Sequence, residues 1–455
     1  MAGQELSTAL RAWRHAHART ALIGAAVLAL AEVDCLLAGL SPWLPPVLAL
    51  LAFLAVRPVP GLVYSVIVLT VPLGLWATGV QGVVGAAFGG RDYMLGLSAV
   101  AVVFVHFVRM AVRWRPSHRQ LLAAAAAGLV LAAATVIGVV HHGLPQALLG
   151  VRFLVFPVAV LAVIAGRPAP DIMKLTNLLA WLLVANGAAA VAEFLIGPPR
   201  LAAWGFDQDR AIRYINGNFR APGLTDFNAE LGMLAGAYLL GYAALRLSGR
   251  RWPRGWLWHA GAAAAAVCLA ASTSRSGAVL IAAGLVAATV STRAGSAVAR
   301  RRARQLGVAA LVLLGLGFAA VGAVGAASLG QRLSTWGSLL RDHVPLYGLG
   351  VGAVGAASNS RVATGPQVFT DNYFINLAMQ FGPVVALLMA VLLVAALGWL
   401  YRGAADHPER VVYFAVLVGL AASSLVIEAW EYEGAMACLS VFVAYAMRVP
   451  AGDAC

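Results

Sequence analysis

Long runs of apolar residues, separated by short polar stretches, recur along almost the whole chain. About 20 such residues make an α-helix long enough to cross the hydrocarbon core of a bilayer. Since 61% of the residues are hydrophobic and 11% are charged, against about 25% charged in soluble domains, a soluble fold is excluded. The sequence predicts an all-α, polytopic bundle of about 12–14 transmembrane helices, with apolar runs at 20–40, 43–56, 60–79, 93–112, 120–140, 148–166, 175–197, 228–247, 256–272, 276–292, 307–327, 373–400, 410–427 and 434–447.

The basic residues indicate how the bundle is oriented. With a cytoplasmic N-terminus, about 22 of the 32 Lys and Arg residues fall on the cytoplasmic side, as the positive-inside rule requires. The net charge of +14 is scattered between apolar runs, so it indicates topology and no nucleic-acid partner. The predicted organisation is a cytoplasmic N-terminus (1–19), N-terminal transmembrane helices (20–197), an extracytoplasmic loop (198–227), central helices (228–327), a large extracytoplasmic loop (328–372), C-terminal helices (373–447) and a cytoplasmic tail (448–455).

Ten arginines fall on the outer side in this orientation, where topology disfavours them. Most of them lie in the two long outer loops, so we expect them to have a role other than topology. They are Arg91, Arg152, Arg200, Arg210, Arg213, Arg220, Arg275, Arg332, Arg341 and Arg361.

The first outer loop ends in a turn next to Arg220. Gly223 and Pro222 favour a turn there, and Asp226 or Asn228 can cap the helix that follows. Arg220 either reaches an anionic head group or pairs with an aspartate and only folds the loop.

A second polar stretch, 272–277, joins two apolar runs by a very short turn. Arg275 must therefore stand at the outer edge of the membrane. Serine and glycine beside it would leave a helix N-terminus open to the outside, and such a terminus with a guanidinium group favours an anion. The alternative is that Arg275 reaches lipid phosphates.

The large outer loop, of roughly 45 residues, is far longer than the usual connection of about 4–6, which favours a functional role. Arg332 and Trp336 are four residues apart and share a helix face. Asp371 and Asn372 stand before a long apolar helix, where Asp371 is either functional or a simple N-cap. His343 is either functional or a hydrogen-bonding loop residue.

Six further acidic residues lie in the last outer turn or inside apolar runs, where an acidic residue is either functional or paired with an arginine. Three glutamates in the last outer turn are interpreted as a solvated cap: Glu428, Glu431 and Glu433. Glu32, Asp34 and Glu193 lie inside apolar runs and could pair with Arg91 or Arg152. No cluster with metal-ligand spacing and no phosphate-binding Walker loop is present in the sequence, so we expect no metal and no cofactor.

An ordered set of motifs resembles the family of bacterial O-antigen ligases and O-antigen polymerases over about residues 200–385. The motifs are Phe219-Arg220-Ala221-Pro222-Gly223, Ser272-Thr273-Ser274-Arg275-Ser276-Gly277, Arg332-Leu333-Ser334-Thr335-Trp336, Pro345-Leu346-Tyr347-Gly348-Leu349-Gly350, Thr370-Asp371-Asn372-Tyr373-Phe374 and Gln380-Phe381-Gly382. Ligases of this family look to have histidine where this chain has Asp371, so the resemblance is more to polymerases of exopolysaccharide type.

The resemblance implies a glycosyltransferase of the bacterial inner membrane that acts on its outer face. The donor would be a glycan on undecaprenyl pyrophosphate, and the acceptor a hydroxyl of another glycan or of a lipid-anchored core. Arg220, Arg275 and Arg332 would hold the pyrophosphate. Asp371 with Asn372, or His343, would orient the acceptor hydroxyl.

Two other interpretations stay open. A flippase for lipid-linked oligosaccharides would have a similar number of spans, but its arginines should line a path through the membrane. An enzyme that uses a polyprenyl monophosphate sugar resembles proteins with an acidic residue in the first outer loop, which Arg91-Asp92 matches faintly.

Overall fold

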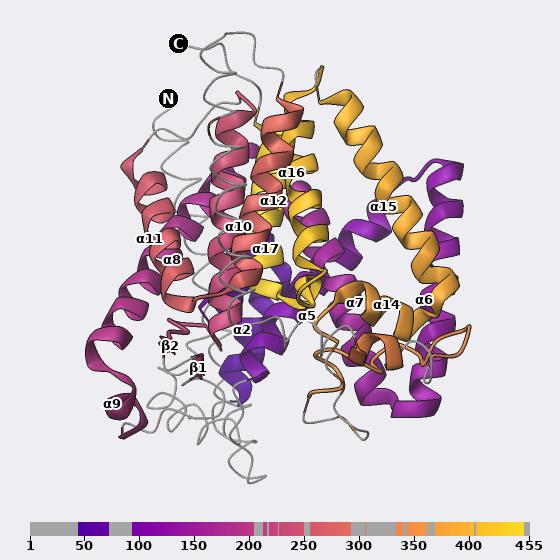
Figure 1. The fold of residues 1–455 in the computed structure, drawn as a ribbon. Helices are drawn as coiled ribbons and strands as arrows, with labels where there is room; N and C mark the ends of the chain where they lie inside the picture. The colour runs from indigo at the N-terminus through magenta and orange to yellow at the C-terminus, as the bar shows by residue number, and fades with distance from the viewer. Residues whose placement is uncertain are drawn as a thin grey trace.

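The computed structural model describes residues 44–71, 93–203, 213–215, 218–225, 227–249, 255–292, 305, 334–339, 344–360, 363, 368, 370–404 and 406–449. The described chain is almost entirely helical, which confirms the predicted all-α class (Figure 1). Its elements are α2 (Leu44–Val56), α3 (Pro58–Thr70), α5 (Tyr93–Arg113), α6 (His118–His142), α7 (Leu144–Ala165), α8 (Ala169–Ile196), α9 (Pro198–Ala203), β1 (Arg213–Ile215), β2 (Asn218–Arg220), α10 (Asn228–Leu247), α11 (Trp256–Ser272), α12 (Arg275–Ser291), α14 (Tyr373–Phe381), α15 (Pro383–Gly403), α16 (Pro408–Ser423), η2 (Ala429–Glu431) and α17 (Glu433–Arg448).

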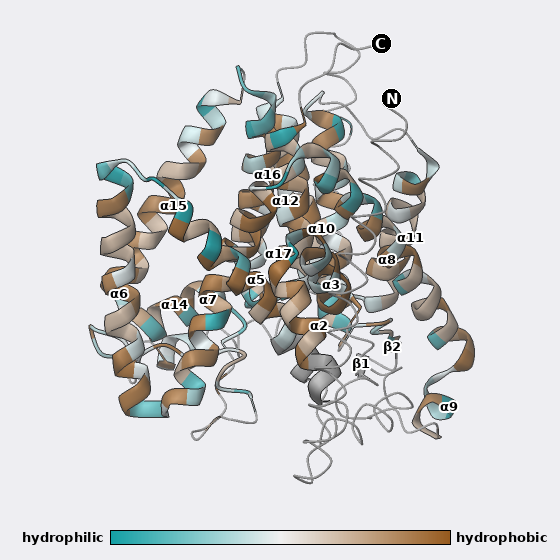
Figure 2. Cartoon of the chain, turned by 180° about the vertical axis from the view of Figure 1, so that it is seen from behind, coloured by the Kyte–Doolittle hydropathy of each residue, from teal (hydrophilic) through white to brown (hydrophobic). Residues whose placement is uncertain are grey.

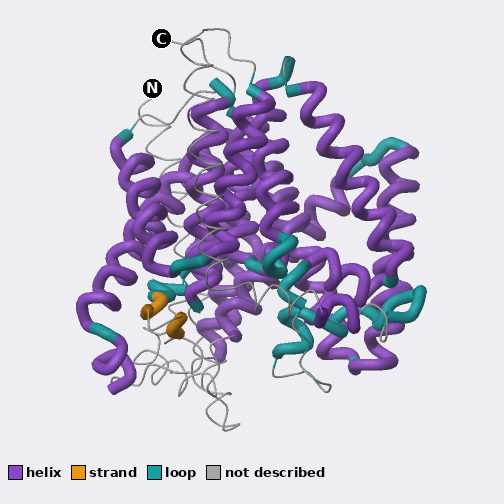
Figure 3. The backbone as a smooth tube through the Cα atoms, in the orientation of Figure 1, coloured by secondary structure: helices purple, strands orange, loops and turns teal. Residues whose placement is uncertain are grey.

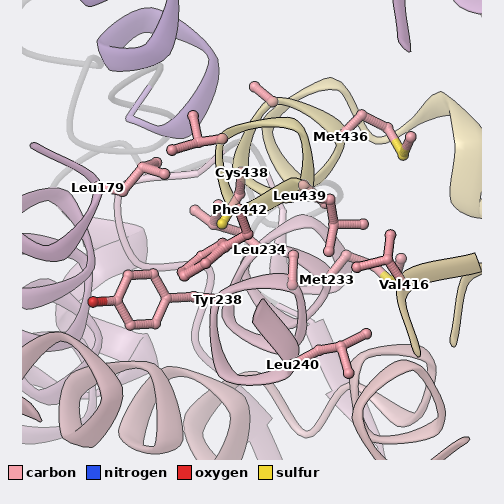
Figure 4. Packing of buried hydrophobic residues seen from close by; sticks show 14 of the residues in the cluster. Leu179, Met233, Leu234, Tyr238, Leu240, Val416, Met436, Cys438, Leu439 and Phe442 are labelled. Carbon is pink, nitrogen blue, oxygen red and sulfur yellow. The ribbon is translucent and has the colours of Figure 1, made fainter. Parts of the chain in front are cut away.

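The core of the bundle lies around α10, which packs against α11, α12, α16 and α17. Figure 4 shows large side chains from several helices interdigitating there. The rings of Tyr238 and Phe442 meet edge to face with centroids 5.3 Å apart, and both side chains are fully buried. Such close packing fixes how α10 and α17 are rotated relative to each other.

Small residues bring α10 and α12 into backbone contact. A Cβ on Gly277 would lie 2.1 Å from the carbonyl oxygen of Gly232, and one on Gly236 would lie 2.7 Å from that of Gly277. Association of helices in a bilayer depends on such close packing, because lipid is as apolar as the side chains. This contact sets the position of the N-terminal end of α12, which carries Arg275.

Two long apolar helices, α6 and α15, lie on the same side of the bundle (Figure 2). Both are exposed along most of their length. In the most apolar stretch of 18 residues, only 11% of α6 and 6% of α15 is buried inside the protein. A helix that is apolar all round and unburied is typical of a membrane span facing lipid.

By length and composition, four of the described helices can cross a membrane: α6, α7, α8 and α15. The pair formed by α2 and α3, bent by 119° at the Arg57-Pro58 junction, would be a fifth. The shorter apolar helices α11 and α12 have 17 residues each. The described part of the chain thus supports a multi-pass membrane protein. The predicted runs at 20–40 and 307–327 lie outside the described residues.

The prediction of one long helix after Asn372 is wrong, because the run at 373–400 is divided into α14 and α15. Gly382 takes a φ of 85° between them, and Pro383 begins α15. A Cβ on Gly382 would lie 2.0 Å from the carbonyl oxygen of Leu346. The break therefore lets the preceding loop pass directly against the helix end.

The polar segments before α10, α14 and α17 lie toward the same end of the bundle, the lower end in Figure 3. The short hairpin of β1 and β2 also lies there, with Tyr214 paired to Phe219 in an antiparallel register. Segments that are distant in the sequence are thereby collected on one face.

Candidate functional site

Arg220 joins the first two polar motifs. Its Nε donates to the Ser272 carbonyl oxygen at 3.1 Å and to Thr273 Oγ1 at 2.8 Å, and its Nη2 donates to the Thr273 carbonyl oxygen at 3.2 Å. The Ala221 amide donates to the Ala271 carbonyl oxygen at 3.1 Å in the same place. The two segments, 52 residues apart in the sequence, therefore form one unit in which Arg220 braces the turn before Arg275.

The turn after Arg220 is anchored by two buried polar side chains of α8. The Gly223 amide donates to Glu193 Oε2 at 2.9 Å, and the Leu224 amide donates to Asn186 Oδ1 at 3.1 Å. Glu193 and Asn186 are fully buried, and Gly223 has a φ of 59°, which favours glycine. Glu193 thus holds this turn, whereas the sequence suggested an arginine partner.

Arg275 is the first residue of α12 and its side chain is exposed. Among the described residues it has no hydrogen bond and no ion pair. No side chain caps the N-terminus of α12, and the expectation that this terminus is open to an anion stays a prediction. Ser274 and Ser276 beside it are only 4% and 6% exposed. They are covered by α10, where a Cβ on Gly232 would meet Ser274 Cβ at 2.0 Å. The exposed side chain of Arg275 is therefore the charged group that this turn presents to an anion.

Asn372, and not Asp371, is the N-cap of α14. Its Oδ1 accepts from the amides of Phe374 at 2.9 Å and Ile375 at 3.2 Å, and it is 5% exposed. Asp371 precedes it with a φ of 47°, a left-handed conformation that costs energy for most residues other than glycine, asparagine and aspartate. The Asp371 side chain is partly exposed and leaves the capping role to its neighbour.

Glu428 fixes the backbone at Asp371. Its Oε1 accepts from the Thr370 amide at 3.1 Å, the Thr370 hydroxyl at 2.8 Å and the Asp371 amide at 3.0 Å. On the other side, Trp336 Nε1 donates to the Thr370 carbonyl oxygen at 2.6 Å. A buried carboxylate that accepts three hydrogen bonds is a strong anchor. Glu428 therefore fixes the position of the Asp371 backbone, from which the Asp371 side chain extends.

Glu431 holds the loop at 344–360. It accepts from the Ala356 amide at 2.6 Å and from Asn376 Nδ2 at 3.0 Å. The network continues through Gln380, whose Nε2 donates to Asn376 Oδ1 and whose Oε1 accepts from the Gly352 amide at 2.9 Å. Burial, with the charge of Glu428 adding to it, raises the pKa of the Glu431 carboxyl to about 8.

The loop at 344–360 is packed into the bundle. The Val351 amide donates to the Ala134 carbonyl oxygen at 2.9 Å, and Gln146 Nε2 donates to the Gly352 carbonyl oxygen at 2.8 Å. Gly350 and Gly352 have φ values of 89° and 91°. A Cβ on Gly350 would lie 2.2 Å from the amide nitrogen of an α6 residue. This non-helical backbone is stable because main-chain and side-chain groups of the neighbouring helices satisfy its hydrogen bonds.

The interpretation of the last three glutamates as a solvated cap is wrong. Glu428 and Glu433 are each 8% exposed. Glu433 forms a two-pronged ion pair with Arg152, at 2.8 Å from Nε to Oε1 and 2.5 Å from Nη2 to Oε2. This pair accounts for the outer-side arginine at 152, because a buried carboxylate requires a partner. Three carboxylates within six residues of an apolar segment were the signal for this arrangement.

Tyr432 lies between the segment that follows Arg220 and the glutamates near Asp371. Its ring lies 5.8 Å from that of Phe227, centroid to centroid, in the segment that follows Arg220. Burial raises the pKa of the Tyr432 hydroxyl well above its usual value, with the charges of Glu428, Glu230, Glu431 and Asp371 adding to the effect. Tyr432 therefore lies within range of the charges of these carboxyl groups and also contacts Phe227.

Two candidate residues from the sequence, Arg332 and His343, lie outside the described residues, as do Asp226 and Arg91. In the ranges that the structure describes, no group of three or more His, Cys, Asp or Glu residues could hold a metal ion. The expectation that no metal or cofactor is used remains a prediction.

Comparison with known proteins gives no relative. No family model, no curated protein and no solved structure matches this chain.

Proposed function

We propose that this protein transfers a glycan from a polyprenyl-pyrophosphate donor to an acceptor hydroxyl at the predicted extracytoplasmic face, as a polymerase or ligase of surface polysaccharide. The single observation that carries the proposal is the contact of Arg220 with the turn that begins at Ser272 and leads into Arg275. Two short motifs that suggested an anion site separately are parts of one rigid unit. That unit lies at the same end of the bundle as α14, which follows Asp371 in the chain (Figure 1).

The chemistry requires cationic charge where the donor loses its glycan. The acceptor oxygen bonds to the anomeric carbon, the bond from that carbon to the pyrophosphate oxygen breaks, and the acceptor proton leaves to a base. Charge that develops on the departing pyrophosphate is stabilised by fixed guanidinium groups. In this proposal the exposed Arg275 binds the pyrophosphate, and Arg220 holds the turn in place and adds its charge.

The base or orienting group would be Asp371, with His343 as the alternative. A carboxylate in hydrogen-bonding reach of a hydroxyl orients it and takes up its proton as the new bond forms. Glu428 supports this role because it holds the Asp371 amide at 3.0 Å. The resemblance to polymerases, which rests on Asp371-Asn372, favours polymerisation over ligation.

The test uses the purified full chain in proteoliposomes with an undecaprenyl-pyrophosphate-linked oligosaccharide. The proposal expects release of free lipid pyrophosphate together with a longer glycan, or with glycan on an added acceptor. Arg275→Ala should lose at least 100-fold in rate, the scale of about 3 kcal/mol for one electrostatic contact to the leaving group. Arg275→Lys should recover part of it, since lysine keeps the charge but loses the planar fork.

Arg119→Ala is the matched control, because Arg119 is an exposed arginine in the first turn of α6 and is not among the arginines predicted on the outer side. Its rate should equal that of the wild type. Full activity of Arg275→Ala would refute the assignment of the site. Unaltered donor in the opposite leaflet, without glycan transfer, would identify a flippase and refute the proposed function.

A further inference from the structure

Three segments that each carry an arginine meet at the end of the bundle opposite to the candidate site. Arg109 lies in the last turns of α5, Arg167 follows the C-terminal end of α7, and Arg448 is the last residue of α17. Arg448 Nε donates to the Ala165 carbonyl oxygen at 2.7 Å, two residues before Arg167. A Cβ on Gly166 would lie 3.3 Å from the sulfur of Met110, which follows Arg109. These contacts bring the three arginine-bearing segments together.

A buried histidine lies within range of the charges of both Arg109 and Arg167. This residue, His106, contacts the Leu54 carbonyl oxygen at 3.0 Å through Nε2. Arg109 Nη1 donates to the carbonyl oxygen of Ala55 next to it. The arginines are thus fixed in part by main-chain carbonyl groups at helix ends, where cations are favoured.

The positive charges in this cluster are not balanced within the part of the chain that the structure describes. None of the three guanidinium groups pairs with a described carboxylate. The first acidic residue after Arg167 is Asp171, whose Oδ1 lies 3.7 Å from the amino group of Lys174. Arg167 Nε is buried and has no hydrogen-bond partner among the described residues. A buried donor without a partner is costly. An anion with hydrogen-bond acceptors would satisfy Arg167 Nε and balance the positive charge of the cluster.

An apolar surface adjoins the cluster. Val105, Val108 and Val112 lie on the same face of α5 as Arg109 and are 38%, 56% and 81% exposed. A soluble anion would leave this apolar surface uncovered, whereas the acyl chains of a lipid would pack against it. Basic pockets at the cytoplasmic ends of transmembrane helices bind anionic lipid head groups, and the predicted topology puts these three arginines on that side.

We propose that Arg109, Arg167 and Arg448 form a binding site for the phosphate of an anionic phospholipid, whose acyl chain lies along the exposed valines of α5. The inference does not depend on the proposed glycan transfer. The acceptor oxygens of the phosphate satisfy Arg167 Nε, and its charge offsets the repulsion among three guanidinium groups.

The test measures the thermal stability of the delipidated full chain in a neutral detergent, titrated with dioleoyl phosphatidylglycerol, dioleoyl phosphatidylcholine or inorganic phosphate. A ligand that binds the folded state raises its stability in a saturable manner. We expect half-saturation with phosphatidylglycerol at a concentration about tenfold lower than with phosphatidylcholine, a difference of about 1.4 kcal/mol. Inorganic phosphate should have no saturable effect.

Variants locate the site. Arg167→Gln and Arg448→Gln should each raise the half-saturating concentration of phosphatidylglycerol by about tenfold, as expected for the loss of one charge-assisted contact. Arg448 is exposed, so its variant should fold even where Arg167→Gln does not. Arg119→Gln is the matched control, since Arg119 is an exposed arginine in the first turn of α6 and lies outside the cluster.

Three results would overturn the proposal. Equal half-saturation for the two lipids would show that the phosphate site has no preference for an anionic lipid. Arg119→Gln weakening the lipid effect as much as Arg448→Gln would reduce it to general surface charge. Saturable stabilisation by inorganic phosphate that is lost in Arg448→Gln would assign the site to a soluble anion.

Discussion

Replacement of Glu428 by alanine is the sharpest test of how the segment at Asp371 is held. The wild-type carboxylate oxygen accepts from two amides and one hydroxyl. In Glu428→Ala the Thr370 hydroxyl keeps its second acceptor, the Asn372 carbonyl oxygen at 3.1 Å, but the amides of Thr370 and Asp371 lose theirs. Thr370 is 1% exposed, so its amide becomes a buried donor without a partner.

The expected loss follows from those two amides. An orphaned buried donor costs about 1–3 kcal/mol. We assign about 2 kcal/mol to the buried Thr370 amide and about 1 kcal/mol to the Asp371 amide, which water can reach more easily. The sum, about 3 kcal/mol, corresponds to a roughly 150-fold larger equilibrium constant for local opening, and to the same increase in the exchange rate of these amides. Hydrogen exchange followed by mass spectrometry on peptides that cover 368–373 measures this change.

Two comparison variants separate the causes. Glu428→Gln keeps an oxygen acceptor and loses only the charge, so exchange should rise by less than about tenfold. Glu409→Gln, in the first turn of α16, should leave exchange of this peptide unchanged. Wild-type exchange rates in Glu428→Ala would refute the inference that this carboxylate holds the backbone at Asp371.

Three further changes test other parts of the structure. Gly138→Ala places a Cβ 2.2 Å from the Val351 carbonyl oxygen, whereas the Cβ of Gly128→Ala, in the same helix, meets nothing within 4 Å. The midpoint of thermal unfolding should fall in Gly138→Ala and not in Gly128→Ala. Equal midpoints would contradict the packing of the loop at 344–360 against α6. The pKa of Glu431 is raised from 4.5 to about 8, so its contribution to stability is full below about pH 4.5 and is lost as the pH rises through about 8. The unfolding midpoint of the wild type should therefore fall with pH over this range, and Glu431→Gln should remove that dependence. An unchanged pH dependence in Glu431→Gln would assign it to other groups. Arg152→Gln and Glu433→Gln should each destabilise by about 3 kcal/mol in chemical denaturation, and the double variant by less than the sum, because each single change strands a buried charged partner; additive losses would show that the pair is not coupled.

The sequence was sufficient for the class of fold. Its apolar runs predicted an all-α membrane protein, and the described helices confirm this class, because hydropathy over about 20 residues is a local property that no tertiary contact alters. It also singled out the segments around Arg220, Arg275 and Asp371, since polar residues between apolar runs are rare enough to be noticed individually.

Partnership between distant residues was decided only by the tertiary structure. Glu428, Glu431 and Glu433 look like a solvent-exposed turn in the sequence, yet Glu428 and Glu433 are buried. Glu428 accepts from an amide 57 residues away, and the partner of Arg152 lies 281 residues away. A side chain of one charge has several possible partners in the sequence, and the packing of helices selects which of them comes within hydrogen-bonding distance. The break at Gly382 has the same origin, because it depends on the close approach of a loop backbone that no local pattern encodes.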